Sequence, residues 1–282
     1  MMDRTDRRQF IQLASAGTLA GAGVFSGMAR VAAAPSPAVA RPFQLGMASY
    51  TFREFSLEQC LAMTVKLGLK KISFKDFHLK MDATPEQIAD TVAKVKAAGL
   101  DLYAGGVIYM RNEADVNRAF DYAKAAGMRM IIGVPNHDLL ELVNKKVQQY
   151  DIGVAIHNHG PTDKVYPTPE SAYEKIKNLD KRIGLCIDIG HTARIGADPV
   201  ADAERFADRL LDLHIKDVSA AKPEGQTVEI GRGVIDIPAL LRTLIKIGYA
   251  RVASFEHEKD ENDPLAGLAE SVGYIRGVLA AI

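Results

Sequence analysis

The chain has 282 residues, of which 48% are hydrophobic and 25% are charged, and its 35 basic and 35 acidic side chains balance. This composition is ordinary for a globular protein, and the zero net charge gives no basic excess for binding nucleic acid or an anionic membrane. The two cysteines, Cys60 and Cys186, match no disulfide framework and no zinc-ribbon spacing, so we expect both to be small buried side chains.

The N-terminal stretch differs from the rest of the chain. Arg7 and Arg8 precede a mildly apolar, Ala/Gly-rich run that ends in three alanines at 32–34. A twin arginine, an apolar run and a small-residue cleavage site in this order resemble a twin-arginine export signal. We therefore expect residues 1–34 to be a signal peptide without a permanent membrane anchor, residues 35–42 to be a Pro/Ala linker, and the mature protein to be periplasmic.

From residue 43 onward, short apolar runs alternate with amphipathic stretches of helical period. Two capping-box patterns, Ser56 with Gln59 and Thr84 with Gln87, predict helix starts between the apolar runs. Eight apolar runs favour β-strands, at residues 43–52, 69–77, 101–110, 128–136, 152–160, 183–191, 210–218 and 251–258.

Eight strand–helix units predict an α/β protein with a single domain, a (β/α)8 TIM barrel over residues 43–282. A doubly wound open sheet is the alternative. The sequence disfavours it, because no Gly-rich phosphate turn follows the first strand.

Polar side chains mark the ends of four consecutive predicted strands, where a barrel of this kind gathers its active site. The fifth strand ends in His157 and His159, the sixth in Asp188, the seventh in His214 and the eighth in Glu256. Because alternate residues of a strand share a face, the first histidine and the three later residues can converge inside the barrel. Two imidazoles and two carboxylates suit one divalent ion, with Mn²⁺, Fe²⁺, Co²⁺ or Zn²⁺ favoured over Mg²⁺. The alternative is that each is a polar residue satisfied separately at the barrel rim.

Four stretches, CIDIGH, LHIKD, GRGVIDIPALLRTLIKIGY and ASFEHE, carry a family resemblance. Through them the region from about residue 43 to the C-terminus resembles the sugar phosphate isomerase/epimerase superfamily, whose members share a xylose-isomerase-like barrel. The resemblance implies that Asp188, His214 and Glu256 are metal ligands. It also implies that Glu256 transfers a proton and that His191 and Lys216 contact the substrate.

The fifth strand departs from that family, whose members usually carry a glutamate where this chain has His157 in the sequence HNH. An imidazole can still bind a metal through one nitrogen. A bound imidazole is a poor base, however, so His159 joins Glu256 as a candidate catalytic residue. His78 and Arg232 lie near strand ends or in the loops that follow, and they are further candidates for substrate binding.

The resemblance implies a metal-dependent isomerase or epimerase that abstracts a proton next to the carbonyl of a small carbohydrate. Elimination from the same intermediate would make the protein a lyase or dehydratase acting on keto-sugars or 3-keto-glycosides. A non-catalytic sugar-binding barrel is the second alternative, because the family glutamate is missing. A nuclease is disfavoured, since the chain has no basic excess and we expect no nucleic acid partner. The sequence leaves a homo-oligomer open.

Overall fold

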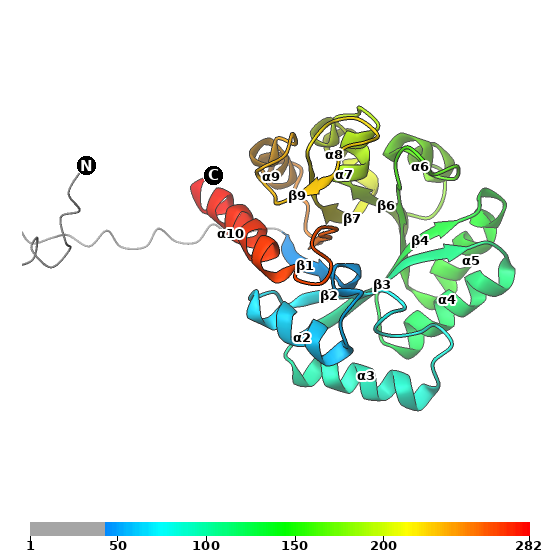
Figure 1. Ribbon diagram of the computed structural model, residues 1–282. Helices are drawn as coiled ribbons and strands as arrows, with labels where there is room; N and C mark the ends of the chain where they lie inside the picture. The colour runs from blue at the N-terminus through cyan, green and yellow to red at the C-terminus, as the bar shows by residue number, and fades with distance from the viewer. Residues whose placement is uncertain (1–42) are drawn as a thin grey trace, which may run out of the picture. The chain divides into compact units, whose positions relative to one another are not determined.

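The computed structural model describes residues 43–282, which form a closed barrel of parallel strands (Figure 1). Residues 1–42, and with them the predicted export signal and linker, lie outside the described residues. The order around the barrel is β1-β10-β7-β6-β5-β4-β3-β2, so strands that follow one another along the chain are neighbours in space, and the predicted TIM barrel is confirmed. The barrel strands are β1 (Gln44–Ala48), β2 (Lys71–Phe74), β3 (Asp101–Met110), β4 (Met130–Pro135), β5 (Gly153–His157), β6 (Ile183–Asp188), β7 (Leu210–Ile215) and β10 (Val252–Phe255).

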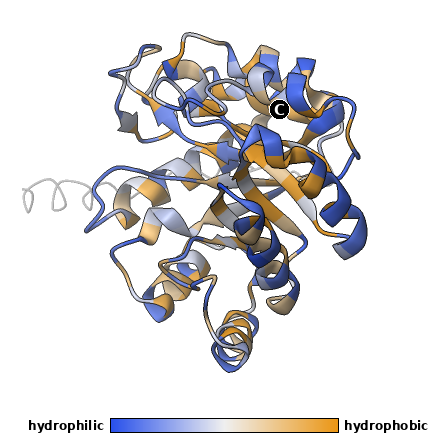
Figure 2. Ribbon diagram, turned by 90° about the vertical axis from the view of Figure 1, so that its right-hand side faces the viewer, coloured by the Kyte–Doolittle hydropathy of each residue, from blue (hydrophilic) through white to orange (hydrophobic). Residues whose placement is uncertain are grey.

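Helices surround the barrel, and the C-terminal helix lies beside β1 (Figure 1). Its Arg276 donates a hydrogen bond to the carbonyl of Gly68, in the turn that precedes β2. Figure 2 shows apolar residues along the strands and polar residues along the loops and outer helical turns. The helices are α2 (Leu57–Lys66), α3 (Pro85–Ala97), α4 (Glu113–Ala125), α5 (Leu140–Tyr150), α6 (Pro169–Ile176), α7 (Ile189–Arg194), α8 (Pro199–Arg205), α9 (Ile237–Lys246) and α10 (Leu265–Ala281), with 3-10 turns η1 (Ser49–Phe52), η2 (His137–Leu139) and η3 (Ala207–Arg209). None of the helices between residues 43 and 282 has the length and apolar composition that a membrane crossing requires.

Several local predictions can be compared with the observed elements. Ser56 and Thr84 cap α2 and α3 in complete capping boxes, and both cysteines are buried, as expected. The third predicted strand has the observed bounds, whereas the others are too long at their carboxyl ends. The strand β5 ends at His157, so His159 lies in a loop, and β6 ends at Asp188, so His191 lies on α7. The chain leaves the barrel directly after the residue that faces the centre.

The carboxylate of Asp217 fastens the loop that follows β7. A short antiparallel hairpin forms there from β8 (Asp217–Val218) and β9 (Thr227–Val228). The buried carboxylate accepts backbone N–H bonds from Val218 and Ile235 on one oxygen and from Gly231 and Gly233 on the other. One side chain therefore satisfies four backbone donors across nearly twenty residues of loop.

Replacing Asp217 by alanine is expected to lower the free energy of unfolding by about 3 kcal/mol or more, because four amides lose an ionised acceptor. Urea denaturation followed by circular dichroism measures the loss. Asp198→Ala is the matched control, since Asp198 caps only the short helix α8 and its loss should cost about 1 kcal/mol. Equal losses in the two variants would contradict the role of Asp217.

Candidate metal centre and substrate pocket

The structure brings together the four predicted metal ligands at the carboxyl end of the barrel. One ligand atom from each of His157, Asp188, His214 and Glu256 lies within 4.8 Å of the others. All four residues are at most 5% exposed. Asp188 and His214 are register partners on adjacent strands, and β5 and β10 flank them. Strand ends that are far apart in sequence therefore meet at one point inside the barrel.

Most of the ligand atoms of this cluster are buried without hydrogen bonds, and Glu256 Oε2 is the exception because it accepts from Lys216. Both ring nitrogens of His157, both of His214, and Oδ2 of Asp188 have no hydrogen-bond partner among residues 43–282. His157 Nε2 lies 3.5 Å from Asp188 Oδ2, and His214 Nδ1 lies 3.3 Å from Glu256 Oε2. Each buried polar group without a partner costs about 1–3 kcal/mol. Two nitrogens and two carboxylate oxygens fit a divalent transition metal ion, which would engage these atoms together.

Asp188 is oriented by the helix that begins directly after it. Its Oδ1 accepts the N–H of His191 at 2.8 Å as the N-cap of α7, which leaves Oδ2 for the cluster. Asn158, the middle residue of HNH, accepts the N–H of Asp188 at 3.0 Å and donates to Thr192 at 3.2 Å. The sequence analysis did not single out Asn158. The available signal was its place between two candidate histidines, on the opposite face of the chain.

Lys216 provides a buried positive charge beside the cluster. Its Nζ lies 3.0 Å from Asp188 Oδ2, 2.8 Å from Glu256 Oε2 and 2.6 Å from Glu258 Oε1. Burial alone would lower the pKa of Lys216, but these carboxylates raise it well above its ordinary value. Burial would raise the pKa of Glu256, but Lys216 and His214 together hold it well below its usual range. Three carboxylates thus surround one ammonium, and the local charge favours a further cation.

The pKa values of the two cluster histidines, His157 and His214, are shifted in opposite directions from the ordinary value. Burial lowers the pKa of His157 to about 3, so the imidazole is neutral at pH 7 and keeps a lone pair for a metal. Burial also acts to lower the pKa of His214, but the neighbouring Glu256 carboxylate outweighs it and raises this pKa. His214 therefore carries a second ring proton more often than His157 does. A metal ion that binds His214 must displace this proton.

A pocket of about 310 Å³ gives small molecules access to the cluster, and this volume lies at the lower end of the range of ligand sites. Its walls include Tyr50, Lys75, Tyr109, His159, His191 and Glu256. Because Glu256 belongs to both the cluster and the pocket wall, a molecule in the pocket can reach a metal held by the cluster.

His159 lies in this pocket beside a carboxylate. Its ring stacks on Tyr109, with Nδ1 3.0 Å from the tyrosine hydroxyl and 3.9 Å from Asp163 Oδ2. This Asp163 oxygen has no hydrogen-bond partner within the described part of the chain. We place the ring proton on Nδ1, where a carboxylate favours it, which leaves the Nε2 lone pair free. The sequence analysis missed Asp163, although its i,i+4 spacing from His159 in HNHGPTD was a usable signal.

The predicted substrate-binding residues divide into two groups. His191 lines the pocket with its ring 5.1 Å from that of His159, and burial lowers its pKa so that it is neutral. Lys216 donates hydrogen bonds to Glu256 and Glu258 and forms an ion pair with Asp188, so its ammonium is engaged by carboxylates. His78 packs on Phe74 and bonds the carbonyl of Phe55. With Arg232 on the surface, these residues lie outside the pocket lining, and their substrate-binding roles stay predictions.

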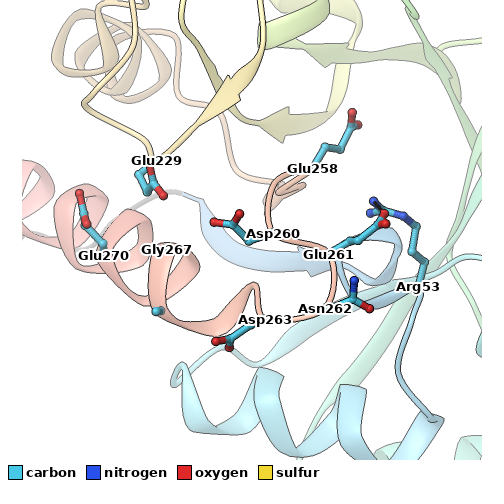
Figure 3. A pocket seen from close by; sticks show the side chains of 10 residues that line it. Arg53, Glu229, Glu258, Asp260, Glu261, Asn262, Asp263, Gly267 and Glu270 are labelled. Atoms are coloured by element: carbon cyan, nitrogen blue, oxygen red, sulfur yellow. Dashed lines mark hydrogen bonds and ion pairs between the residues drawn. The ribbon is translucent and has the colours of Figure 1, made fainter.

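An acidic depression of about 820 Å³ borders the site at Glu258 (Figure 3). Most of its charge is already paired, because Glu229 bonds Lys259 and Glu270 bonds Arg232. Figure 3 shows Glu258 pointing away from the other carboxylates, consistent with its bond to Lys216. The depression therefore contributes one residue, Glu258, to the site.

Known proteins share this architecture. Residues 57–278 match the family model of the xylose isomerase-like TIM barrel. A segment of 133 residues is 32% identical to the rhizopine catabolism protein MocC of Rhizobium meliloti, and the match spans 42% of this chain but only 40% of that protein.

Solved structures with similar folds include an L-ribulose 3-epimerase, with a TM-score of 0.69 and 19% identity over 85% of this chain and 95% of that one. The apo form of the 3-keto-D-glucoside 4-epimerase YcjR from E. coli has a TM-score of 0.67 and 14% identity, covering 83% of this chain and 99% of that one. At these identities the two structures show a shared fold. Since the family model spans most of the chain and the barrel is closed, the protein belongs to the xylose isomerase-like TIM barrel family.

Proposed function

We propose that this protein is a metal-dependent carbohydrate isomerase or epimerase, which removes a proton next to a carbonyl group. The observation that carries the proposal is the buried cluster of His157, Asp188, His214 and Glu256, which opens onto a pocket containing His159. The ring nitrogens of both histidines and Oδ2 of Asp188 lack hydrogen-bond partners within residues 43–282. The fold shared with two sugar epimerases supports a carbohydrate substrate.

The residues of the chain have separate tasks in this reaction. A divalent ion in the cluster would supply a Lewis acid that stabilises the negative charge left on the substrate oxygens. His159 takes the proton at Nε2, because Tyr109 and Asp163 hold its Nδ1 proton. Glu256 is the weaker proton acceptor, since Lys216 and His214 hold its pKa low, and it acts mainly as a ligand. The neutral ring of His191 is available to bind a substrate hydroxyl.

A lyase or dehydratase acting on keto-sugars is the second candidate, and the position of Tyr109 favours it. Elimination needs a proton donor for the departing oxygen as well as a base. Burial raises the pKa of Tyr109, so its hydroxyl stays protonated at neutral pH while its oxygen accepts from His159. Base and acid would then lie side by side on one wall of the pocket.

Metal analysis and proton exchange test the proposal together. The purified protein should contain about one divalent ion per chain, and His214→Ala should weaken ion binding by at least about 100-fold. His137→Ala, which changes an exposed histidine outside the cluster, should keep the ion. The metal-loaded protein should exchange the α-proton of D-fructose, D-tagatose, D-psicose or methyl 3-keto-glucoside in D₂O.

The outcomes separate the candidate functions. Exchange with return of the proton indicates an isomerase or epimerase, whereas release of a leaving group identifies the lyase. Sugar binding with a bound ion but no exchange would establish a binding protein instead. A wild-type chain that binds no divalent ion would reject the metal site itself.

A further inference from the structure

A second compartment of about 290 Å³ adjoins the substrate pocket. The two spaces share Lys75, Val107 and Tyr109 as lining residues, and the second one extends between the loops that follow β2 and β3. The pocket at the metal cluster is of a size for one sugar ring. A space of similar volume on the other side of three shared residues provides room for a second ring.

Lys75 is the flexible side chain among the three residues that lie between the two spaces. Lys75 Nζ donates to the carbonyl of Val107 at 2.6 Å, and the lysine side chain is 22% exposed. A lysine has a flexible stem and three rotatable donors, so it can turn from this carbonyl to an oxygen of a bound molecule. The part of the boundary that Lys75 forms is therefore held by one hydrogen bond, beside Val107 and Tyr109.

The lining of the second compartment fits a neutral, polyhydroxylated ring. Asp76 and Arg111 supply charged hydrogen-bonding groups, while Phe74 and Tyr122 supply apolar surface. The Arg111 guanidinium lies over the Tyr109 ring at 5.5 Å, so this wall presents guanidinium donors held against an aromatic ring. Asp76 lies 3.6 Å from Lys75 Nζ and offsets part of the positive charge of Lys75 and Arg111. A few polar groups in an apolar wall are typical of sites that orient a small ligand.

We propose that this compartment is a second sugar subsite and that the substrate is a glycoside rather than a free monosaccharide. The reacting ring lies at the metal cluster, the attached ring lies beside Arg111 and Asp76, and Lys75 donates to the oxygen that links them. The reacting ring at the cluster rests on the proposed function. The binding of the attached ring does not depend on turnover.

Calorimetric titration of the metal-loaded full chain tests the subsite with methyl glucoside, maltose and cellobiose as probes. At least one disaccharide should bind about tenfold or more tightly than methyl glucoside. Arg111→Ala should remove this preference and leave methyl glucoside affinity within twofold. Arg118→Ala, which changes an exposed arginine on α4 outside the compartment, is the matched control and should keep the preference.

Equal binding of all three probes by the wild type would overturn the subsite, as would a disaccharide preference that Arg111→Ala leaves unchanged. Tighter binding of p-nitrophenyl glucoside than of either disaccharide, insensitive to Arg111→Ala, would also overturn it in favour of an aryl site. Disaccharide preference without proton exchange would reject the proposed function alone. Proton exchange without any preference would reject the subsite alone.

Discussion

Replacing His159 by glutamine is expected to lower the rate of α-proton exchange by about 10²–10⁴-fold, the usual contribution of a positioned base. His159 is outside the cluster of four ligands, so the variant should bind its divalent ion as tightly as the wild type. Exchange measured by NMR in D₂O, together with metal analysis of the same sample, checks both halves of the prediction. Unchanged exchange in His159→Gln would assign the base to Glu256.

Asp163→Asn extends this experiment to the residue that orients the base. The variant keeps the shape of the side chain but removes the charge beside Nδ1 of His159, so exchange should fall by about tenfold or more. The ¹⁵N chemical shifts of the His159 ring report which nitrogen carries the proton. If the wild type and Asp163→Asn gave the same tautomer, Asp163 would have no positioning role.

Lys216→Met is expected to destabilise the metal-free protein by about 3–5 kcal/mol, because it leaves carboxylates buried without a counter-charge. A divalent ion should restore much of this stability, since Asp188 and Glu256 are its proposed ligands as well as partners of the lysine. We also expect tighter ion binding in the variant, as the ion no longer competes with an ammonium for the same two oxygens. Thermal unfolding with and without Mn²⁺ measures both effects.

Lys181→Met is the control for this comparison, because Lys181 forms an exposed pair with Asp208 whose contribution should lie between about 0 and 1 kcal/mol. The gain in melting temperature on adding Mn²⁺ should be larger for Lys216→Met than for the wild type and the control. An equal gain in all three proteins would show that the lysine and the ion act on separate sites.

The sequence was sufficient for the fold and for the convergence of the four ligand residues. Strand and helix periods alternate along residues 43–282, and barrel closure brings consecutive strand ends together, so strand alternation predicted that His157, Asp188, His214 and Glu256 converge. Their role as metal ligands stays a prediction.

Residues whose place depends on loop conformation could not be predicted in the same way. Asp163 lies beside His159 only because the loop after β5 turns back. Lys75 borders the pocket from the end of β2, where the sequence shows no motif that would predict a binding residue. Strand alternation put Lys216 on the same face as His214, but β7 ends at Ile215, and the side chain reaches the carboxylates instead of the pocket. His78 pairs with a backbone carbonyl, which local sequence does not reveal.

The two oxygens of Asp188 serve different needs, and this affects how related sequences should be interpreted. One oxygen starts α7 and the other faces the cluster, so a descendant that lost its metal would still be under selection to keep this aspartate for the helix. His157 and His214 have no such second structural role, because their ring nitrogens form no hydrogen bonds with the described residues. In this lineage the two histidines, more than the aspartate, would therefore distinguish an active enzyme from a barrel that has only kept its shape.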